Sequence, residues 1–299
     1  GIRNDWVDRS GSVSAEEEHD EDEHGEEHDE EEHHDEEAAL QYFDTEESVT
    51  SYGLQISRQF NETMSATLNL ASVERAPAAV ELFMNGPHLA TGRYEVGNPN
   101  LDTEKANSAE LLLDYAGDTF FGSVSVFTND IDDYIYLDFT GEEAEETPIA
   151  AYLQQDATFS GFEAELTFTL AQNDRYNAEL TLFGDRVRAD LDAGGNVPRI
   201  PASKFGSEIR YYGDNWSTHL HVTRVDDQED VALLELATDG YTLVSIYADY
   251  HIAVGDSELK LFARGDNLLD EQVRNHASFL KLYSPEFGRG VTLGVRYEY

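Results

Sequence analysis

Residues 162–170 read FEAELTFTL, and apolar residues fill every second position without exception. Successive side chains on a β-strand point to opposite faces, so this stretch predicts a strand with one apolar and one polar face. The same period of two recurs at 216–223 (WSTHLHVT) and at 291–299 (VTLGVRYEY). The chain is therefore predicted to be all-β.

The whole chain shows this period in about twelve segments. The predicted strands are 2–10, 48–60, 63–72, 104–116, 119–139, 151–171, 175–190, 203–213, 215–227, 240–253, 257–266 and 288–299. Short turns rich in Gly, Asn and Asp join them at 61–62, 117–118, 173–174, 213–214 and 255–256. Longer connections lie between these turns at 11–47, 73–103, 140–150, 191–202, 228–239 and 267–287.

The connections alternate between short and long, which indicates the kind of sheet. Outer-membrane barrels place short turns at the periplasmic end and long loops at the extracellular end. Aromatic residues near predicted strand ends suit the girdles of such barrels, and they are Tyr115, Phe120, Phe121, Tyr211, Tyr212, Tyr250, Tyr297 and Tyr299. The prediction is a transmembrane antiparallel β-barrel wall in contact with outer-membrane lipid. The alternative is a soluble all-β protein with an acidic surface.

Composition excludes several functions. The chain has 299 residues with 62 acidic and 19 basic side chains, a formal charge of -43 that repels nucleic-acid phosphates. It has no cysteine, so a disulfide scaffold, a thiolate zinc site and a cysteine nucleophile are excluded. The sequence contains no GxSxG, phosphate-binding glycine loop or HExxH motif. We therefore expect a protein that is not an enzyme.

Residues 16–37 form a segment with 16 acidic residues, five histidines and no hydrophobic residue. The histidines are His19, His24, His28, His33 and His34. Neutral imidazole and carboxylate are ligands for Zn²⁺, so the segment is predicted to capture divalent metal ions without a fixed fold. Copper(II) and nickel(II) use the same ligands, so the segment does not select zinc. The alternative is an acidic low-complexity loop whose histidines bind nothing.

Two further stretches resemble a known family. Residues 74–104 read ERAPAAVELFMNGPHLATGRYEVGNPNLDTE, and residues 262–299 contain DNLLD, NHASFL and an alternating final strand that ends in Tyr299. Both are similar to TonB-dependent outer-membrane receptors. Within that family, GPHLATGRYEVGN, NHASFL and the histidine-rich segment most resemble the zinc-uptake receptors.

The resemblance implies a fold and a function for the chain. It implies the C-terminal part, about twelve strands, of a larger plugged barrel of about 22 strands, whose plug and early strands are absent from this sequence. The implied function is import of zinc or a similar divalent metal, driven by the TonB-ExbB-ExbD complex through the absent N-terminal region. His88 and His276 are the implied metal ligands in ordered loops. The alternatives are a siderophore or haem receptor of the same family, and a passive porin.

The even number of strands predicts where the C-terminus lies, and the alternation of side chains predicts which face His219 and His221 share. If the long connections face the cell exterior, with the histidine-rich loop at 11–47, the twelfth strand runs inward and Tyr299 lies in the periplasm. His219 and His221 share the polar, lumenal face of one strand, and this pattern favours ordinary lumen lining over the alternative of a paired metal site. Lumenal acidic and basic side chains are expected to form ladders against a plug.

Overall fold

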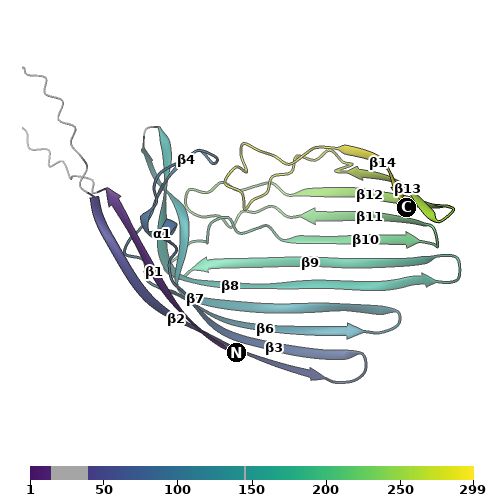
Figure 1. The fold of residues 1–299 in the computed structure, drawn as a ribbon, viewed down its shortest axis with the longest axis horizontal. Coiled ribbons are helices and arrows are strands. Elements are labelled where there is room, and N and C mark those ends of the chain that lie inside the picture. The colour runs from purple at the N-terminus through teal and green to yellow at the C-terminus, as the bar shows by residue number, and fades with distance from the viewer. Residues whose placement is uncertain (15–39, 145) are drawn as a thin grey trace, which may run out of the picture.

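The protein is described here by a computed structural model, in which residues 1–14, 40–144 and 146–299 are placed. It is an almost entirely β structure (Figure 1). The elements are β1 (Ile2–Ser14), β2 (Leu40–Gln59), β3 (Met64–Arg75), α1 (Ala79–Phe83), β4 (Asn85–His88), β5 (Arg93–Val96), β6 (Glu104–Ala116), β7 (Phe120–Ala144), β8 (Thr147–Gln172), β9 (Asn177–Leu191), β10 (Lys204–Tyr212), β11 (Trp216–Val225), β12 (Tyr241–Val254), β13 (Ser257–Asp266) and β14 (Gly290–Glu298).

Twelve of these strands form one curved, antiparallel path in chain order, from β1 through β3 to β6 and on to β14. The predicted twelve-stranded wall is therefore confirmed. The sheet is open, with β1 and β14 at its edges. Short turns gather at one end of the strands and long connections at the other, and the C-terminus lies at the short-turn end (Figure 1). No helix among the described residues is long and apolar enough to cross a bilayer.

The convex face of the wall is apolar. Strand pairing aligns one row of outward side chains across six strands: Phe120, Phe168, Leu180, Ile209, Leu220 and Ile246. Leu220 is 39% exposed and Ile246 43% exposed, although neither has a polar group to offer water. A continuous apolar band of this kind is what a barrel presents to lipid.

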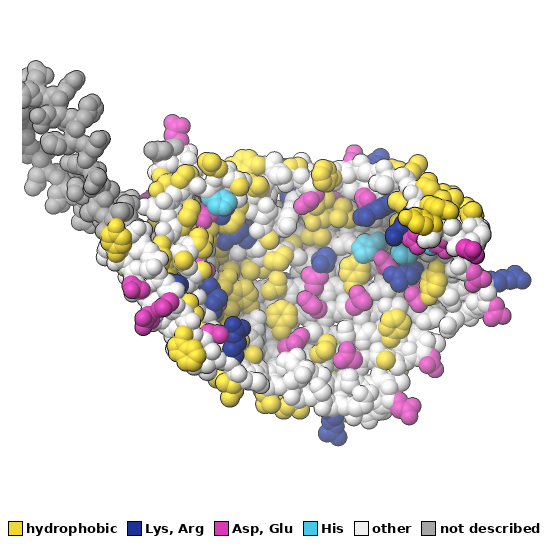
Figure 2. Space-filling view, viewed as in Figure 1, with side chains coloured by type: hydrophobic (Ala, Val, Ile, Leu, Met, Phe, Trp, Pro, Cys, Tyr) yellow, Lys and Arg dark blue, Asp and Glu magenta, His cyan; other side chains and the backbone are white. Residues whose placement is uncertain are grey.

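The concave face is polar and charged. Figure 2 shows this hollow side, where acidic, basic and histidine side chains are interspersed with apolar ones. Asp185 pairs with Lys204 at 2.9 Å, and Asp249 pairs with Lys260 at 2.6 Å. His219 and His221 lie on this face, as their alternation with Leu220 predicted, and His221 stacks on Phe183. The inner wall thus has charged, ion-paired side chains, and their contact with a plug stays a prediction.

Glycines opposite phenylalanines shape the sheet. Four such pairs face each other directly across neighbouring strands: Phe127–Gly161, Gly184–Phe205, Phe183–Gly206 and Phe262–Gly294. At each of these glycines a Cβ atom would lie within 2.6 Å of the opposing ring. The ring fills the space that the missing side chain leaves, a device that lets a sheet bend without opening a void.

Several predicted boundaries and positions were wrong. Residues 11–14 and 40–47 belong to β1 and β2, so the predicted loop 11–47 is shorter than expected and its centre lies outside the described residues. Phe121 and Tyr212 face the concave side, because they pair with the inward residues Thr167 and Asn177, and so do not belong to a lipid-facing girdle. Outward aromatic pairs do gather near the short turns, among them Tyr211 with Trp216.

Candidate functional site

The long-connection end is organised by an extension of β7 and β8 beyond their neighbours. The pairing register shifts between Ile131 and Tyr134, where Asp133 adopts a φ of 57°. The amide of Asp133 donates to the carboxylate of Asp156 at 2.9 Å, which stabilises this bulge. A bulge increases strand twist and re-aims the chain, so the tip of the β7–β8 pair curls away from the line of the wall (Figure 1).

Long connections cover both faces of the extension. On one face, Leu82 of α1 and Leu101 pack with Ile135 in a buried cluster. On the other, Tyr134 of β7 packs against a cluster that Val197 from connection 192–203 forms with Ala157 and Ala189 at the base of the extension. Because both faces are covered by apolar contacts, the connections have fixed positions on the extension.

The β4–β5 hairpin brings a buried ion pair to this region. β5 pairs in parallel with β8, through Glu95 opposite Ala150. Arg93 and Glu95 are 6% and 3% exposed, and their side chains meet at 2.6 Å. The Nε and Nη1 atoms of Arg93 have no hydrogen-bond partner among the described residues. The remaining compensation for this buried charge comes from an aromatic ring.

That ring belongs to Phe279, in connection 267–289. The guanidinium carbon of Arg93 lies 3.6 Å from the ring centroid, and that of Arg199 lies 4.0 Å from it. Two guanidinium groups at these distances cannot share one face of a ring, so they lie on opposite faces. Cation–π contacts are strongest where water is excluded. Phe279 thereby joins three long connections and also contacts Phe139 of β7, with ring centroids 6.2 Å apart.

Glu235, in connection 226–240, ties the same connections by hydrogen bonds. Its carboxylate accepts from the ammonium of Lys281 at 2.6 Å and from the amide nitrogens of Arg199 and Ala232. The ring of His276 contacts it at 3.1 Å. Burial favours the neutral acid, but the bonds from His276, Lys281 and the two amides prevail and lower the pKa of Glu235 to about 2. Burial also lowers the pKa of Lys281, against the opposing pull of Glu235.

His276 is held by both ring nitrogens. Nδ1 bonds with the hydroxyl of Thr238 at 2.9 Å, while Nε2 lies 3.1 Å from Glu235 and 3.3 Å from the ammonium of Lys281. A metal ion at Nε2 would have to displace Lys281, whose positive charge repels it. The structure thus gives His276 a place in the loop junction, and its role as a metal ligand stays a prediction.

His88 and the remaining histidines occupy other places. His88 ends β4, and its Nδ1 bonds with the hydroxyl of Thr91 at 2.7 Å. His19, His24, His28, His33 and His34 lie outside the described residues. His251 contacts Glu258 at 2.7 Å on the inner wall, far along the strand from the loop junction. Within the described ranges, no three His, Asp or Glu side chains are grouped so that they could hold a metal ion.

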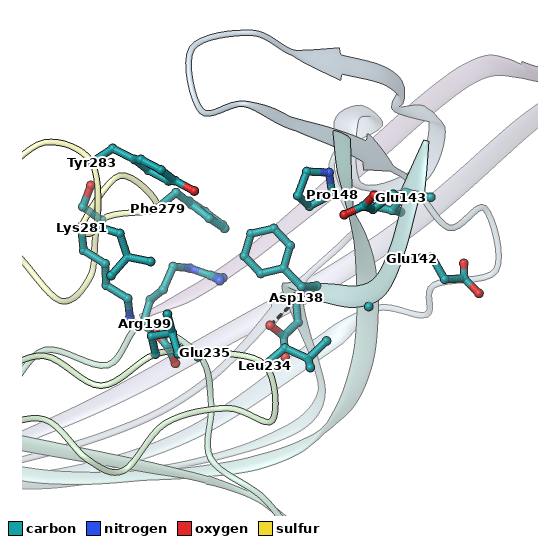
Figure 3. Close-up of a pocket in the computed structure, with 16 residues that line it drawn as sticks. Asp138, Glu142, Glu143, Pro148, Arg199, Leu234, Glu235, Phe279, Lys281 and Tyr283 are labelled. Carbon is teal, nitrogen blue, oxygen red and sulfur yellow. Dashed lines mark hydrogen bonds and ion pairs between the residues drawn. The ribbon is translucent and has the colours of Figure 1, made fainter. Parts of the chain in front are cut away.

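A cavity of about 310 Å³ opens beside this junction (Figure 3). Phe279 and Tyr283 stand on one side of it, and Pro148 and Glu143 on the other. Arg199, Lys281 and Glu235 lie at its base. The cavity is therefore framed by the tip of the β7–β8 extension and by residues of three long connections, 192–203, 226–240 and 267–289.

Sequence reasoning missed the residues that organise this end. Arg93 and Phe279 stand in GPHLATGRYEVGN and NHASFL, the two stretches that directed attention to His88 and His276. In the sequence, Phe279 is only an aromatic residue in a predicted loop and Arg93 only a basic one. Neither pattern predicts a contact. Only the folded arrangement brings Arg93, Arg199 and Phe279 together across 186 positions of the chain.

The wall, its alternating turns and its folded loops define the class of protein as a transmembrane β-barrel. Residues 1–268 match the family model described as TonB dependent receptor-like, beta-barrel. The chain belongs to this family of outer-membrane receptors.

Solved structures share the fold. A copper transporter, OprC, superposes with a TM-score of 0.68 at 19% identity, over 86% of this chain and 41% of the transporter. The siderophore receptor PirA of Acinetobacter baumannii gives 0.62 at 18% identity, over 86% of this chain and 42% of that one. The ferric enterobactin receptor PfeA of Pseudomonas aeruginosa gives 0.59 at 18% identity, over 86% and 41%. The chain spans about two-fifths of the length of these structures, and the similarity to zinc-uptake receptors stays a prediction.

Proposed function

We propose that this chain forms barrel wall and loops of a TonB-dependent receptor that imports zinc, or a similar divalent metal ion, across the outer membrane. The observation that carries the proposal is the density of ligands at 16–37, where five histidines and 16 acidic residues fall within 22 positions. Imidazole and carboxylate side chains at such density bind divalent ions in many alternative arrangements. The negative charge of the chain adds a field that concentrates cations near its surface.

The proposed path has two stages. The histidine-rich segment, on the exterior side, captures ions, and His88 receives one. The expected carboxylate partners of His88 were Glu74, Glu81 or Glu95, and of these Glu81 is paired with Arg75 and Glu95 with Arg93. Exchange between weak ligand sets moves an ion only down its free-energy gradient. Release into the periplasm then requires work, which the TonB complex supplies by moving a plug.

The similar structures leave the cargo open, because they include a copper transporter as well as siderophore receptors. Copper(II) binds imidazole more tightly than zinc, so the same segment would also serve a copper receptor. A siderophore receptor, the second candidate, has no evident use for five clustered histidines. The segment therefore favours a metal ion as cargo.

Uptake of radioactive zinc by cells that carry the full-length receptor tests the proposal. Replacing all five histidines of the segment with asparagine is expected to lower uptake at limiting zinc by at least about tenfold, since the ligands are removed. The matched control changes five acidic residues of the same segment, Glu16, Glu17, Glu18, Glu21 and Glu23, to glutamine and keeps the histidines. Unchanged zinc uptake in the histidine variant, with uptake of a ferric siderophore by the same cells, would contradict the proposal.

Acidification supplies a second test of histidine ligation. Free imidazole titrates near pH 6.5, and its protonated form cannot bind a metal. Zinc binding by the receptor in detergent is therefore expected to weaken between pH 7.5 and pH 5.5, as measured by isothermal titration. Equal affinities at the two pH values would show that carboxylates alone bind the ion.

A further inference from the structure

The cavity beside the loop junction has an apolar interior. Its apolar lining comes from β7, β8 and two long connections, and consists mainly of Phe139, Pro148, Ile149, Leu234, Leu236 and Leu282. At about 310 Å³ it holds one or two large side chains. The hydrogen-bonded cluster around Glu235 closes its base (Figure 3).

The apolar surface continues outside the cavity. Leu234, Leu236, Leu282 and Tyr283, here called the apolar mouth, are 47%, 57%, 43% and 81% exposed. These side chains lie on the two connections that Glu235 and Lys281 hold together, so they are presented on a fixed framework. A contiguous exposed apolar patch with a polar rim is typical of an interaction site.

The charge around the mouth is negative. The cavity lining has four carboxylates and two basic side chains. Both basic groups are engaged: Lys281 with Glu235, and Arg199 with the Leu137 carbonyl and the Phe279 ring. Glu142 and Glu143 are exposed on the rim strand and have no ion pair among the described residues. An occupant that complements this surface has an apolar part for the cavity and positive charge for the rim.

We propose that the apolar mouth is a docking site for a basic polypeptide segment, which inserts one large apolar side chain into the cavity while its lysines or arginines face Glu142 and Glu143. A polypeptide fits better than a small molecule, because the apolar surface and the rim carboxylates extend beyond the cavity itself. The formal charge of -43 would attract a basic partner to the protein as a whole, and Glu142 and Glu143 supply the negative charge at this face. The site contains no histidine, so it stands independently of which ion the receptor imports.

A photo-reactive peptide tests the location. The probe is the heptapeptide Lys-Lys-Gly-Phe-Gly-Lys-Lys, acetylated and amidated, with benzoylphenylalanine in place of Phe, added to the full-length receptor in detergent. The expected crosslinks, mapped by mass spectrometry, fall within residues 139–143, 148–149, 234–236 and 278–283, which line the cavity. Crosslinks confined to other surfaces would overturn the proposal.

Fluorescence polarisation of the labelled heptapeptide tests the chemistry. Replacing its Phe with Ala is expected to weaken binding by about tenfold, and replacing its lysines with glutamate to abolish it. In the receptor, Leu236→Ser and the pair Glu142→Gln with Glu143→Gln are expected to weaken binding by a similar factor. Leu89→Ser and Glu146→Gln are the matched controls, because these residues are exposed but line no part of the cavity.

Three outcomes would contradict the proposed occupant. Equal binding of the Phe and Ala peptides would mean that charge alone attracts them. Equal loss in the Leu89→Ser control would mean that the mouth has no special role. Full competition by phenylalanine amide alone would mean that the site takes a small organic cation and not a polypeptide. The peptide variants keep the test decisive even if a receptor variant folds poorly.

Discussion

At the scale of single residues, Glu235 controls the junction of the long connections. Its carboxylate is 6% exposed and bonds with groups from three of them. Glu235→Gln keeps the shape but removes the charge, so Lys281 loses its counter-ion in a buried place. Breaking a buried pair in this way costs about 3–5 kcal/mol. We expect faster hydrogen exchange in residues 228–239 and 276–283, while Glu229→Gln, an exposed change in the same connection, leaves exchange unaltered.

The same carboxylate makes the junction sensitive to acid. Because folding lowers the pKa of Glu235 from 4.5 to about 2, its stabilising contribution is complete above pH 4.5 and is lost as the pH falls toward 2. Hydrogen exchange of residues 228–239, corrected for the intrinsic rate, is expected to accelerate over this interval. In Glu235→Gln the acceleration over that interval should be absent, and its persistence would show that another group titrates.

Phe279 is the second residue whose removal has a specific readout. Arg93 and Arg199 are trypsin sites shielded by the ring between them. Phe279→Ala removes the ring, so cleavage after Arg93 and Arg199 is expected to accelerate at least about tenfold, as measured by mass spectrometry of the digest. Phe287→Ala is the control, because Phe287 lies in the same connection but is 95% exposed. Equal cleavage in both variants would mean that Phe279 does not hold the junction.

At the scale of elements, the strands follow from the sequence better than the connections do. A period of two predicts both the strand and the direction of each side chain. At 162–170, the apolar residues Phe162 and Leu166 face outward, and the acidic residues Glu163 and Glu165 face inward. The extension of β7 and β8 over 140–144 and 147–150 was missed because its residues do not alternate. The contacts of Phe279 and Glu235 were missed because they join distant segments, and no local pattern encodes such contacts.

The phenylalanine–glycine pairs allow a test of how the strands pack. A Cβ atom at Gly184 would lie 2.6 Å from Cδ1 of the Phe205 ring, so Gly184→Ala forces the ring to move. Overpacking of this kind costs about 1–3 kcal/mol. The expected result is a lower temperature for the shift in gel mobility that accompanies barrel unfolding. Adding Phe205→Ala removes the clash, so the double variant should lose less stability than the two single changes predict together. Strict additivity would contradict the packing role of the ring.

At the scale of the whole molecule, the assignment as a membrane barrel requires that the apolar face of the wall contacts lipid and that the polar face lines a hydrated lumen. Leu220 and His219 are neighbours in β11, yet Leu220 belongs to the outward apolar row and His219 faces Arg210 and Tyr247 on the inner wall. Arginine on the lipid face near the middle of a bilayer costs about 2–4 kcal/mol, whereas a lumenal arginine remains hydrated. Leu220→Arg is therefore expected to lower the free energy of unfolding of the full receptor in lipid vesicles, measured by urea titration. His219→Arg, one position away, should leave it within about 1 kcal/mol of the parent. If the inward change were the damaging one, the polar face would be the buried face, and the wall would enclose a packed core in place of a hydrated lumen.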